Sequence, residues 1–195
     1  MLRSEGNGCF IGEDFIGCLL FADDILLMSS SIWHLQYMLD VCYTYCQEWD
    51  LKFNVKKSNV MIVGKSDGAV MPPIHLGTEL LCWVSEMKYL GVILYSKGGL
   101  RVNVHVNCRK FLGSSFSILQ SCRGFNEQVL CEIILTKCLP ILMYGLESFR
   151  LLAAERDKVK MAFNCVIRRI FKLSKFTSVR HIIHMIGSKP GIYFD

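Results

Sequence analysis

The chain has 195 residues, 52% of them hydrophobic, and a formal net charge of +5. This length allows one domain or two small ones with a real hydrophobic core. The mean hydropathy of +0.34 is high for a soluble protein, yet no uncharged apolar run approaches the length of about 18 residues that a membrane span needs. The first 15 residues contain three acidic side chains and lack the basic lead and apolar core of a signal peptide.

The ten cysteines are scattered singly, and many have apolar neighbours. No CxxC motif occurs. Cys42 and Cys46 are four residues apart, which places them on one helical face, and no histidine follows at the spacing of a zinc site. The pattern favours reduced thiols in an intracellular protein of the nucleus or cytoplasm that is not secreted.

Charge is distributed unevenly along the chain. Residues 1–100 contain 7 Lys or Arg and 11 Asp or Glu, whereas residues 101–195 contain 15 and 6. A basic half is typical of proteins that bind nucleic acid. A solvated basic helix face gives the same pattern, so charge alone leaves both interpretations open.

The most informative stretch is Phe21-Ala22-Asp23-Asp24, which lies between the apolar runs 16–20 and 25–28. Short runs rich in branched residues predict two buried strands joined by a tight turn. Two carboxylates at the tip of an apolar hairpin would be costly to bury without a divalent cation. The alternative is a solvated turn, in which aspartate is common and needs no function.

Residues 32–49 are predicted to form an amphipathic helix that packs on a sheet, with Ser29–Ser31 as candidates for its N-cap. Short strands are predicted over 60–63, 80–84 and 87–94, with a loop over 64–73. The apolar positions on one helix face recur at spacings of three and four: Ile32, Leu35, Leu39, Cys42, Cys46 and Trp49.

The second half is predicted to be helical over 103–121, 126–139, 141–152, 155–172 and 179–185, with Pro140 ending or kinking the second of these. The fourth helix has an apolar stripe formed by Val159, Ala162, Phe163, Val166, Ile167 and Ile170. Four aromatic residues on apolar stripes are predicted to lie in the core: Trp33, Trp49, Phe116 and Phe163.

Four motifs in this order resemble the reverse transcriptase of a non-LTR (LINE-like) retrotransposon. Phe21-Ala22-Asp23-Asp24 resembles the F/Y-A-D-D hairpin of its palm, and Leu51–Ser58 resembles the block that follows. Lys88-Tyr89-Leu90-Gly91-Val92 is similar to the K-Y-L-G segment at the primer grip. Leu139–Phe149 is similar to a P-x-L-x-Y-G-x-E-x-W stretch beyond the polymerase core, with Phe149 in place of tryptophan.

The resemblance implies an α+β fold, with a partial palm over 1–100 and an all-helical thumb and following region over 101–195. It implies an RNA-directed DNA polymerase that joins nucleotides with two metal ions, Mg²⁺ or Mn²⁺, on an RNA template and a DNA primer. Asp23 would be a direct metal ligand with Asp24 in support. Lys57 would lie near the pyrophosphate and donate a proton to it.

The same resemblance places Tyr89, Leu90 and Gly91 along the primer strand. Basic side chains of the helical half would hold the template and primer through phosphates; the candidates are Lys158, Lys160, Arg168, Arg169, Lys172 and Lys175. The alternatives are a solvated loop lysine for Lys57, plain strand residues at 89–91 and a solvated helix face.

Only 22 residues precede Asp23, and the family's upstream metal-binding block, hydrophobic-D-x-x-x-A-F-D, is absent from them, as is the block that positions the nucleotide. We therefore expect a reverse transcriptase fragment that binds Mg²⁺ weakly and does not polymerise alone. We also expect an uncovered apolar hairpin face that causes poor solubility or association. The alternative function is a non-catalytic nucleic-acid-binding or interaction module that uses the basic helices.

Overall fold

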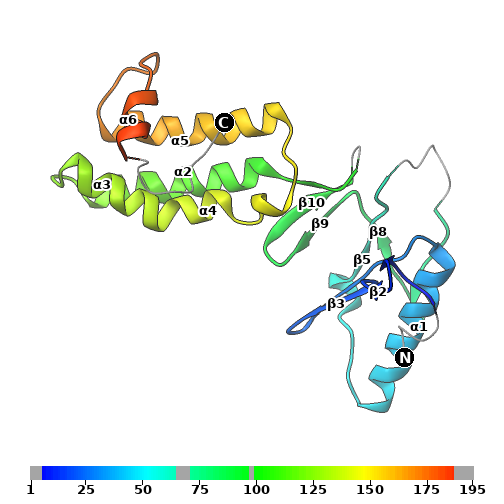
Figure 1. Cartoon of the computed structure of the whole chain (residues 1–195). Coiled ribbons are helices and arrows are strands. Elements are labelled where there is room, and N and C mark those ends of the chain that lie inside the picture. Colours follow the sequence, from blue (N-terminus) through cyan, green and yellow to red (C-terminus); the bar gives the residue numbers. More distant parts are fainter. Residues whose placement is uncertain (1–5, 65–70, 97–98, 187–195) are drawn as a thin grey trace. The chain divides into compact units, whose positions relative to one another are not determined.

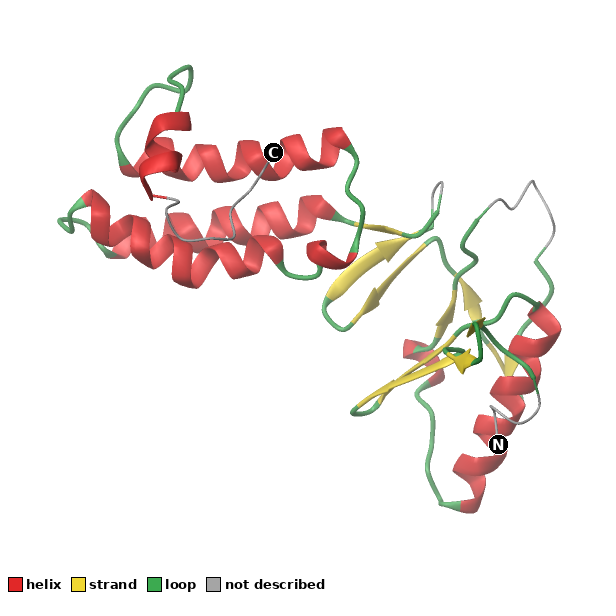
Figure 2. Cartoon of the chain, viewed as in Figure 1, coloured by secondary structure: helices red, strands yellow, loops and turns green. Residues whose placement is uncertain are grey.

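The computed structural model describes residues 6–64, 71–96 and 99–186 (Figure 1). The chain divides into two compact units, one comprising Met1–Leu90 and Ser96–Leu100 and the other Gly91–Tyr95 and Arg101–Asp195. Short strand pairs and one α-helix characterise the first unit, and helices dominate the second (Figure 2). The predicted α+β fold is confirmed. Residues 65–70 of the predicted loop and residues 187–195 lie outside the described part.

The first unit contains short antiparallel hairpins and one parallel strand pair. Strands β1 (Phe10–Ile11) and β2 (Asp14–Phe15) pair with each other, as do β3 (Cys18–Phe21) and β4 (Asp24–Leu27). The remaining elements are α1 (Ile32–Glu48), a 3-10 helix η1 (Val55–Lys57), β5 (Asn59–Val60), β6 (His75–Leu76), β7 (Glu79–Leu80), β8 (Cys82–Trp83) and β9 (Glu86–Tyr89). β5 runs parallel to β8, and β6 pairs antiparallel with β7.

Helix α1 forms where the periodicity predicts it and supplies one wall of the first core. Its residues Ile32, Leu35, Leu39 and Tyr43 pack on a buried cluster made of Val60, Ile74, Leu76 and Leu81. The Gln36 side chain also donates to the backbone oxygen of His75 and accepts from its N–H, both at 2.9 Å. Ser31 is the N-cap residue, but its side chain makes no capping bond. Instead, the Ser31 N–H donates to Ser29 Oγ.

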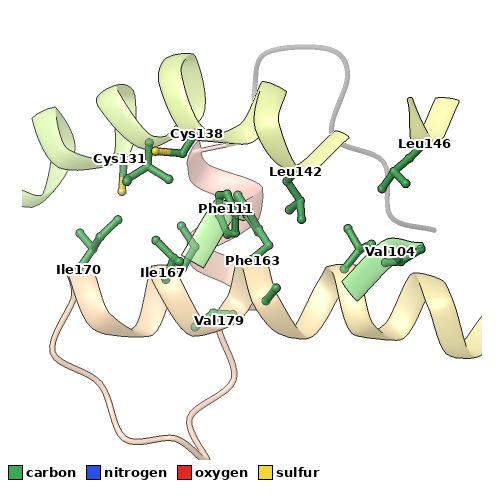
Figure 3. Packing of buried hydrophobic residues seen from close by; sticks show 14 of the residues in the cluster. Val104, Phe111, Cys131, Cys138, Leu142, Leu146, Phe163, Ile167, Ile170 and Val179 are labelled. Carbon is green, nitrogen blue, oxygen red and sulfur yellow. The ribbon is translucent and has the colours of Figure 1, made fainter. Parts of the chain in front are cut away.

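The second unit is built around a single helical core (Figure 3). Its elements are β10 (Val92–Tyr95), which pairs antiparallel with β11 (Arg101–Val102), then α2 (Val104–Ser121), α3 (Glu127–Ile133), α4 (Leu139–Met143), α5 (Ala153–Ile170) and α6 (Arg180–Ile186). The rings of Phe111 and Phe163 stack in this core with centroids 6.3 Å apart. All six residues of the apolar stripe predicted for α5 are buried.

Pro140 does not end the helical segment in which it lies. A π-helical turn, η2 (Ile134–Cys138), joins α3 to α4, and Pro140 occupies the first turn of α4, where a missing N–H is tolerated. The prediction of helix over 141–152 is wrong beyond Met143. Gly145 adopts a left-handed φ of 74°, which ends the helix, and only a short 3-10 helix, η3 (Leu146–Ser148), follows before α5.

Three strand predictions and three aromatic core predictions also need correction. Residues 80–84 do not form one strand, because Leu80 belongs to β7 and Cys82–Trp83 form β8, which pairs with a different strand. Residues 60–63 are extended only at β5, and 87–94 forms two strands separated by a turn at Leu90–Gly91 because both turn residues have positive φ. Trp33, Trp49 and Phe116 are exposed, whereas Phe163 is buried as predicted. Each amphipathic helix buries one face only, and these three rings lie outside the buried arc of α1 or α2.

Candidate functional site

The two aspartates lie at the tip of the β3–β4 hairpin. The register pairs Phe21 with Asp24, so Ala22 and Asp23 form a two-residue turn and Asp24 is the first residue of the returning strand. Ala22 has a φ of 48°, in the left-handed region that is costly for a residue with a Cβ. The predicted hairpin is confirmed, and both carboxylates are exposed.

The strands of this hairpin are not buried, contrary to the prediction. Leu20 is 71% exposed and Phe21 is 63% exposed, and Leu19 and Ile25 are also exposed. Their apolar composition is that of a strand covered on both faces, but the described residues leave it uncovered. The expected open apolar face is therefore present at the tip of the hairpin.

The opposite end of the hairpin is held against α1 by close glycine packing. A Cβ atom on Gly17 would lie 2.6 Å from the Phe15 ring, and one on Gly8 would lie 2.8 Å from the same ring and 3.3 Å from the sulfur of Met38. Met38 is completely buried. Met28 N–H donates to the Gly17 oxygen at 2.7 Å, which extends the ladder past the strand ends. The aspartates thus extend from an anchored base.

Asp23 and Asp24 provide the hard oxygen ligands that Mg²⁺ prefers. Within the described residues, however, no group of three His, Cys, Asp or Glu side chains is placed to hold a metal ion. Mg²⁺ demands a nearly octahedral oxygen shell, and two exposed carboxylates supply only part of it. The described residues therefore do not form a complete metal site.

Lys57 lies at the end of η1 and is exposed. The turn that presents it is organised by the backbone oxygen of Asn54, which accepts from Lys57 N–H at 2.9 Å and from the Ser58 hydroxyl at 3.1 Å. No described hydrogen bond or ion pair joins the Lys57 side chain to either aspartate. The two predicted catalytic elements are therefore present as separate local structures.

In the second unit, parts of two predicted motifs pack against each other. A Cβ atom on Gly91 would lie 3.4 Å from Cε1 of Tyr144, and one on Gly145 would lie 2.5 Å from Cγ2 of Val92. The 88–92 segment and the 139–149 segment are about fifty residues apart in sequence. The glycines at both positions leave the space that this contact requires.

Asn107 secures the same contact and lies outside the predicted motifs. Its side-chain amide lies on α2 and donates to the backbone oxygens of Leu142 at 3.1 Å and Tyr144 at 2.8 Å. Asn107 is buried, and these bonds give its amide the acceptors that a buried polar group needs. The available signal was an asparagine between buried apolar positions of a helix, where a polar side chain needs a partner.

The six basic candidates lie on α5 and the loop that follows it. Four are exposed and two, Lys158 and Arg168, are half-buried. Lys158 Nζ lies 2.9 Å from His105 Nε2, and Arg168 Nε donates to the Thr177 oxygen at 2.9 Å. Lys160 is two residues from Lys158 and occupies a different face of α5. The candidates therefore lie on different faces of α5 and on the loop after it, and they do not form one compact patch.

A segment that contains the Asp-Asp hairpin matches a known family. Residues 10–94 match the reverse transcriptase (RNA-dependent DNA polymerase) family. The match includes the β3–β4 hairpin, Lys57 and the Leu90–Gly91 turn, and it supports the assignment of this segment to a reverse transcriptase. That family uses divalent metal ions and works on a nucleic acid template and primer. No curated protein and no solved structure matches the chain.

Among the described helices, none combines the length and the hydropathy that a bilayer crossing requires. All ten cysteines are free thiols.

Proposed function

We propose that the chain is the C-terminal part of the palm, with the thumb and following region, of a non-LTR (LINE-like) reverse transcriptase. The observation that carries this proposal is the two-residue Ala22–Asp23 turn, which presents Asp23 and Asp24 within the matched segment. The 139–149 segment, which packs on Gly91 and Val92, supports the LINE-like type because it resembles a stretch beyond the polymerase core. The free cysteines suit an intracellular location.

Within this proposal each candidate residue has a role. Asp23 and Asp24 would contribute carboxylates to a Mg²⁺ or Mn²⁺ shell, Lys57 would face the pyrophosphate, and residues 89–91 would follow the primer. The chain alone would bind metal weakly and would not extend a primer, because the described residues supply only two of the ligands.

Primer extension on a poly-rA template with an oligo-dT primer tests the catalytic part. We expect no incorporation above background with Mg²⁺ or Mn²⁺ by wild-type protein whose folding is verified by circular dichroism. Asp23→Ala and Asp24→Ala proteins serve as matched controls. Incorporation that disappears in both variants would show a complete active site and would overturn the proposed inactivity of the chain alone.

A second function, a non-catalytic nucleic-acid-binding module, is favoured by one observation. Residues 158–186 contain seven Lys or Arg and no Asp or Glu. Such a segment would bind phosphates independently of sequence and with strong salt dependence. Titration of a labelled template–primer duplex at several salt concentrations tests this role, and a protein that does not bind at low salt would exclude it.

A further inference from the structure

The loop between α5 and α6 displays an aromatic ring to solvent. Phe176 is 84% exposed, the largest exposed fraction among the large hydrophobic side chains described. The ring therefore offers apolar surface that a binding partner can contact. The loop occupies the end of the unit where α5 turns back into α6 (Figure 1).

The loop is held in a defined conformation around this ring. Arg168 Nε donates to the Thr177 oxygen at 2.9 Å, and Thr177 N–H donates to the Ser174 oxygen at 3.0 Å. The Phe176 N–H donates to Ser174 Oγ at 3.4 Å. Val179 is buried in the helical core and fixes the far end of the loop. The ring is therefore presented by an anchored turn.

The charged residues that flank the ring in sequence are basic. Lys175 Nζ lies 4.9 Å from the centre of the Phe176 ring, which is a cation–π distance. Lys172 and Arg169 are exposed at the end of α5, and Arg180 is exposed at the start of α6. The nearest acidic residue before the loop in sequence is Asp157. A partner that carries negative charge and a flat apolar face would complement this surface.

We propose that this loop binds an unpaired segment of nucleic acid, with a base stacked on Phe176 and its flanking phosphates held by Lys172 and Lys175. Aromatic side chains beside basic ones bind single strands in this way, because every base has a flat face and every nucleotide has a phosphate. A base in a duplex is already stacked on its neighbours and cannot take this position without unstacking. This inference rests on the proposed nucleic-acid function of the helical unit and adds the form of nucleic acid that it prefers.

The test uses the full chain and fluorescence anisotropy of labelled oligo(dT), oligo(rU), an abasic oligonucleotide and a duplex of equal length. We expect Phe176→Ala to weaken binding to oligo(dT) or oligo(rU) by about tenfold. Binding to the abasic strand and to the duplex should not change. Phe176→Trp should retain the affinity and Phe176→Leu should lose it, which separates stacking from simple apolar contact.

Phe125→Ala is the matched control. Phe125 is another exposed phenylalanine in a loop of the same unit, but it has Arg123 and Glu127 at equal distance in sequence and so lacks a uniformly basic setting. This variant should bind every probe as the wild type does. A salt titration adds a second test. Lys172→Ala and Lys175→Ala should reduce the salt dependence of the binding affinity. Phe176→Ala should lower the affinity but leave its salt dependence unchanged.

The outcomes separate this inference from the function on which it rests. Wild-type and Phe176→Ala proteins that bind single strands equally well would overturn the stacking site and leave the nucleic-acid role intact. If Phe176→Ala lost affinity for abasic and base-bearing strands equally, the stacking site would also be overturned, because stacking requires a base. Wild-type protein that binds none of the probes at low salt would overturn the nucleic-acid role itself.

Discussion

Several residues with a Cβ adopt the left-handed conformation at the points where the candidate motifs turn. Ala22 lies at the tip of the Asp-Asp hairpin, Leu90 precedes Gly91, and Lys172 follows α5, with φ values of 48°, 45° and 52°. Such a conformation costs a residue of this kind about 1 kcal/mol. It persists where the surrounding structure requires it, and such positions concentrate at functional sites. Here the backbone itself requires it, because two of these residues lie in hairpin turns and the third follows the C-cap of α5.

Gly145 allows the most specific prediction at this scale. Gly145→Ala should destabilise the second unit strongly, because its φ is 74° and the new Cβ would lie 2.5 Å from Cγ2 of Val92. Gly124→Ala is the matched control, since its φ is 99° but nothing lies within 4 Å of the new Cβ. In urea unfolding, Gly145→Ala should lower the free energy of unfolding by about 1 kcal/mol or more beyond the decrease caused by Gly124→Ala. Equal losses would show that Val92 moves aside without cost.

The thiol of Cys131 links stability to pH. Burial, and to a lesser extent the charge of Glu127, raises the pKa of Cys131 from 9.0 to about 11. Between these values the unfolded chain loses the thiol proton and the folded chain keeps it, so the free energy of unfolding should fall as pH rises from 9 to 11. Cys131→Ala should show a smaller fall over this range in urea unfolding measured at several pH values. A variant that follows the wild-type pH dependence would contradict the assignment.

At the scale of elements, the β3–β4 hairpin combines an anchored base with an uncovered apolar tip. Exposed apolar strands promote association between chains. Leu20→Lys should shift the wild-type protein from associated species toward the 22.3 kDa monomer in sedimentation velocity. Because Leu20 is exposed, its replacement should change the free energy of unfolding by no more than about 0.5 kcal/mol.

Leu152→Lys is the control for this experiment, because Leu152 is an exposed leucine that belongs to the second unit and not to the hairpin. It should leave the association of the wild type unchanged. A wild-type protein that is already monomeric at the highest concentration tested would contradict the role of the hairpin in association.

Periodicity predicted the long helices because their burial is set by their own sequence. The apolar stripe of α5 is buried as predicted, and α1 and α2 each begin within one residue of their expected starts. Elements that depend on distant partners were less predictable. The exposure of Leu20 depends on what else covers the hairpin, and the continuation of helix through Pro140 depends on a π-helical turn that no composition signal marks. The role of Asn107 was hidden because its partners are backbone oxygens about 35 residues away.

At the scale of the whole molecule, each unit has its own hydrophobic core, and the two described clusters share no residue. All three tryptophans, Trp33, Trp49 and Trp83, belong to the first unit. Among the described α-helices, α1 alone belongs to the first unit, and the others lie in the second. Tryptophan fluorescence therefore reports on the first unit, and far-ultraviolet circular dichroism reports mainly on the second.

This division predicts that equivalent core substitutions will be detected by different probes. Ile167→Val in the second core and Ile74→Val in the first are chemically identical changes at fully buried positions, each expected to cost about 1 kcal/mol. In urea unfolding, Ile167→Val should shift the circular dichroism transition and leave the fluorescence transition in place. Ile74→Val should shift the fluorescence transition instead. If either substitution shifts both transitions together, the two units unfold as one cooperative body. A substitution in one core can lower the stability of the other only if the two cores unfold together.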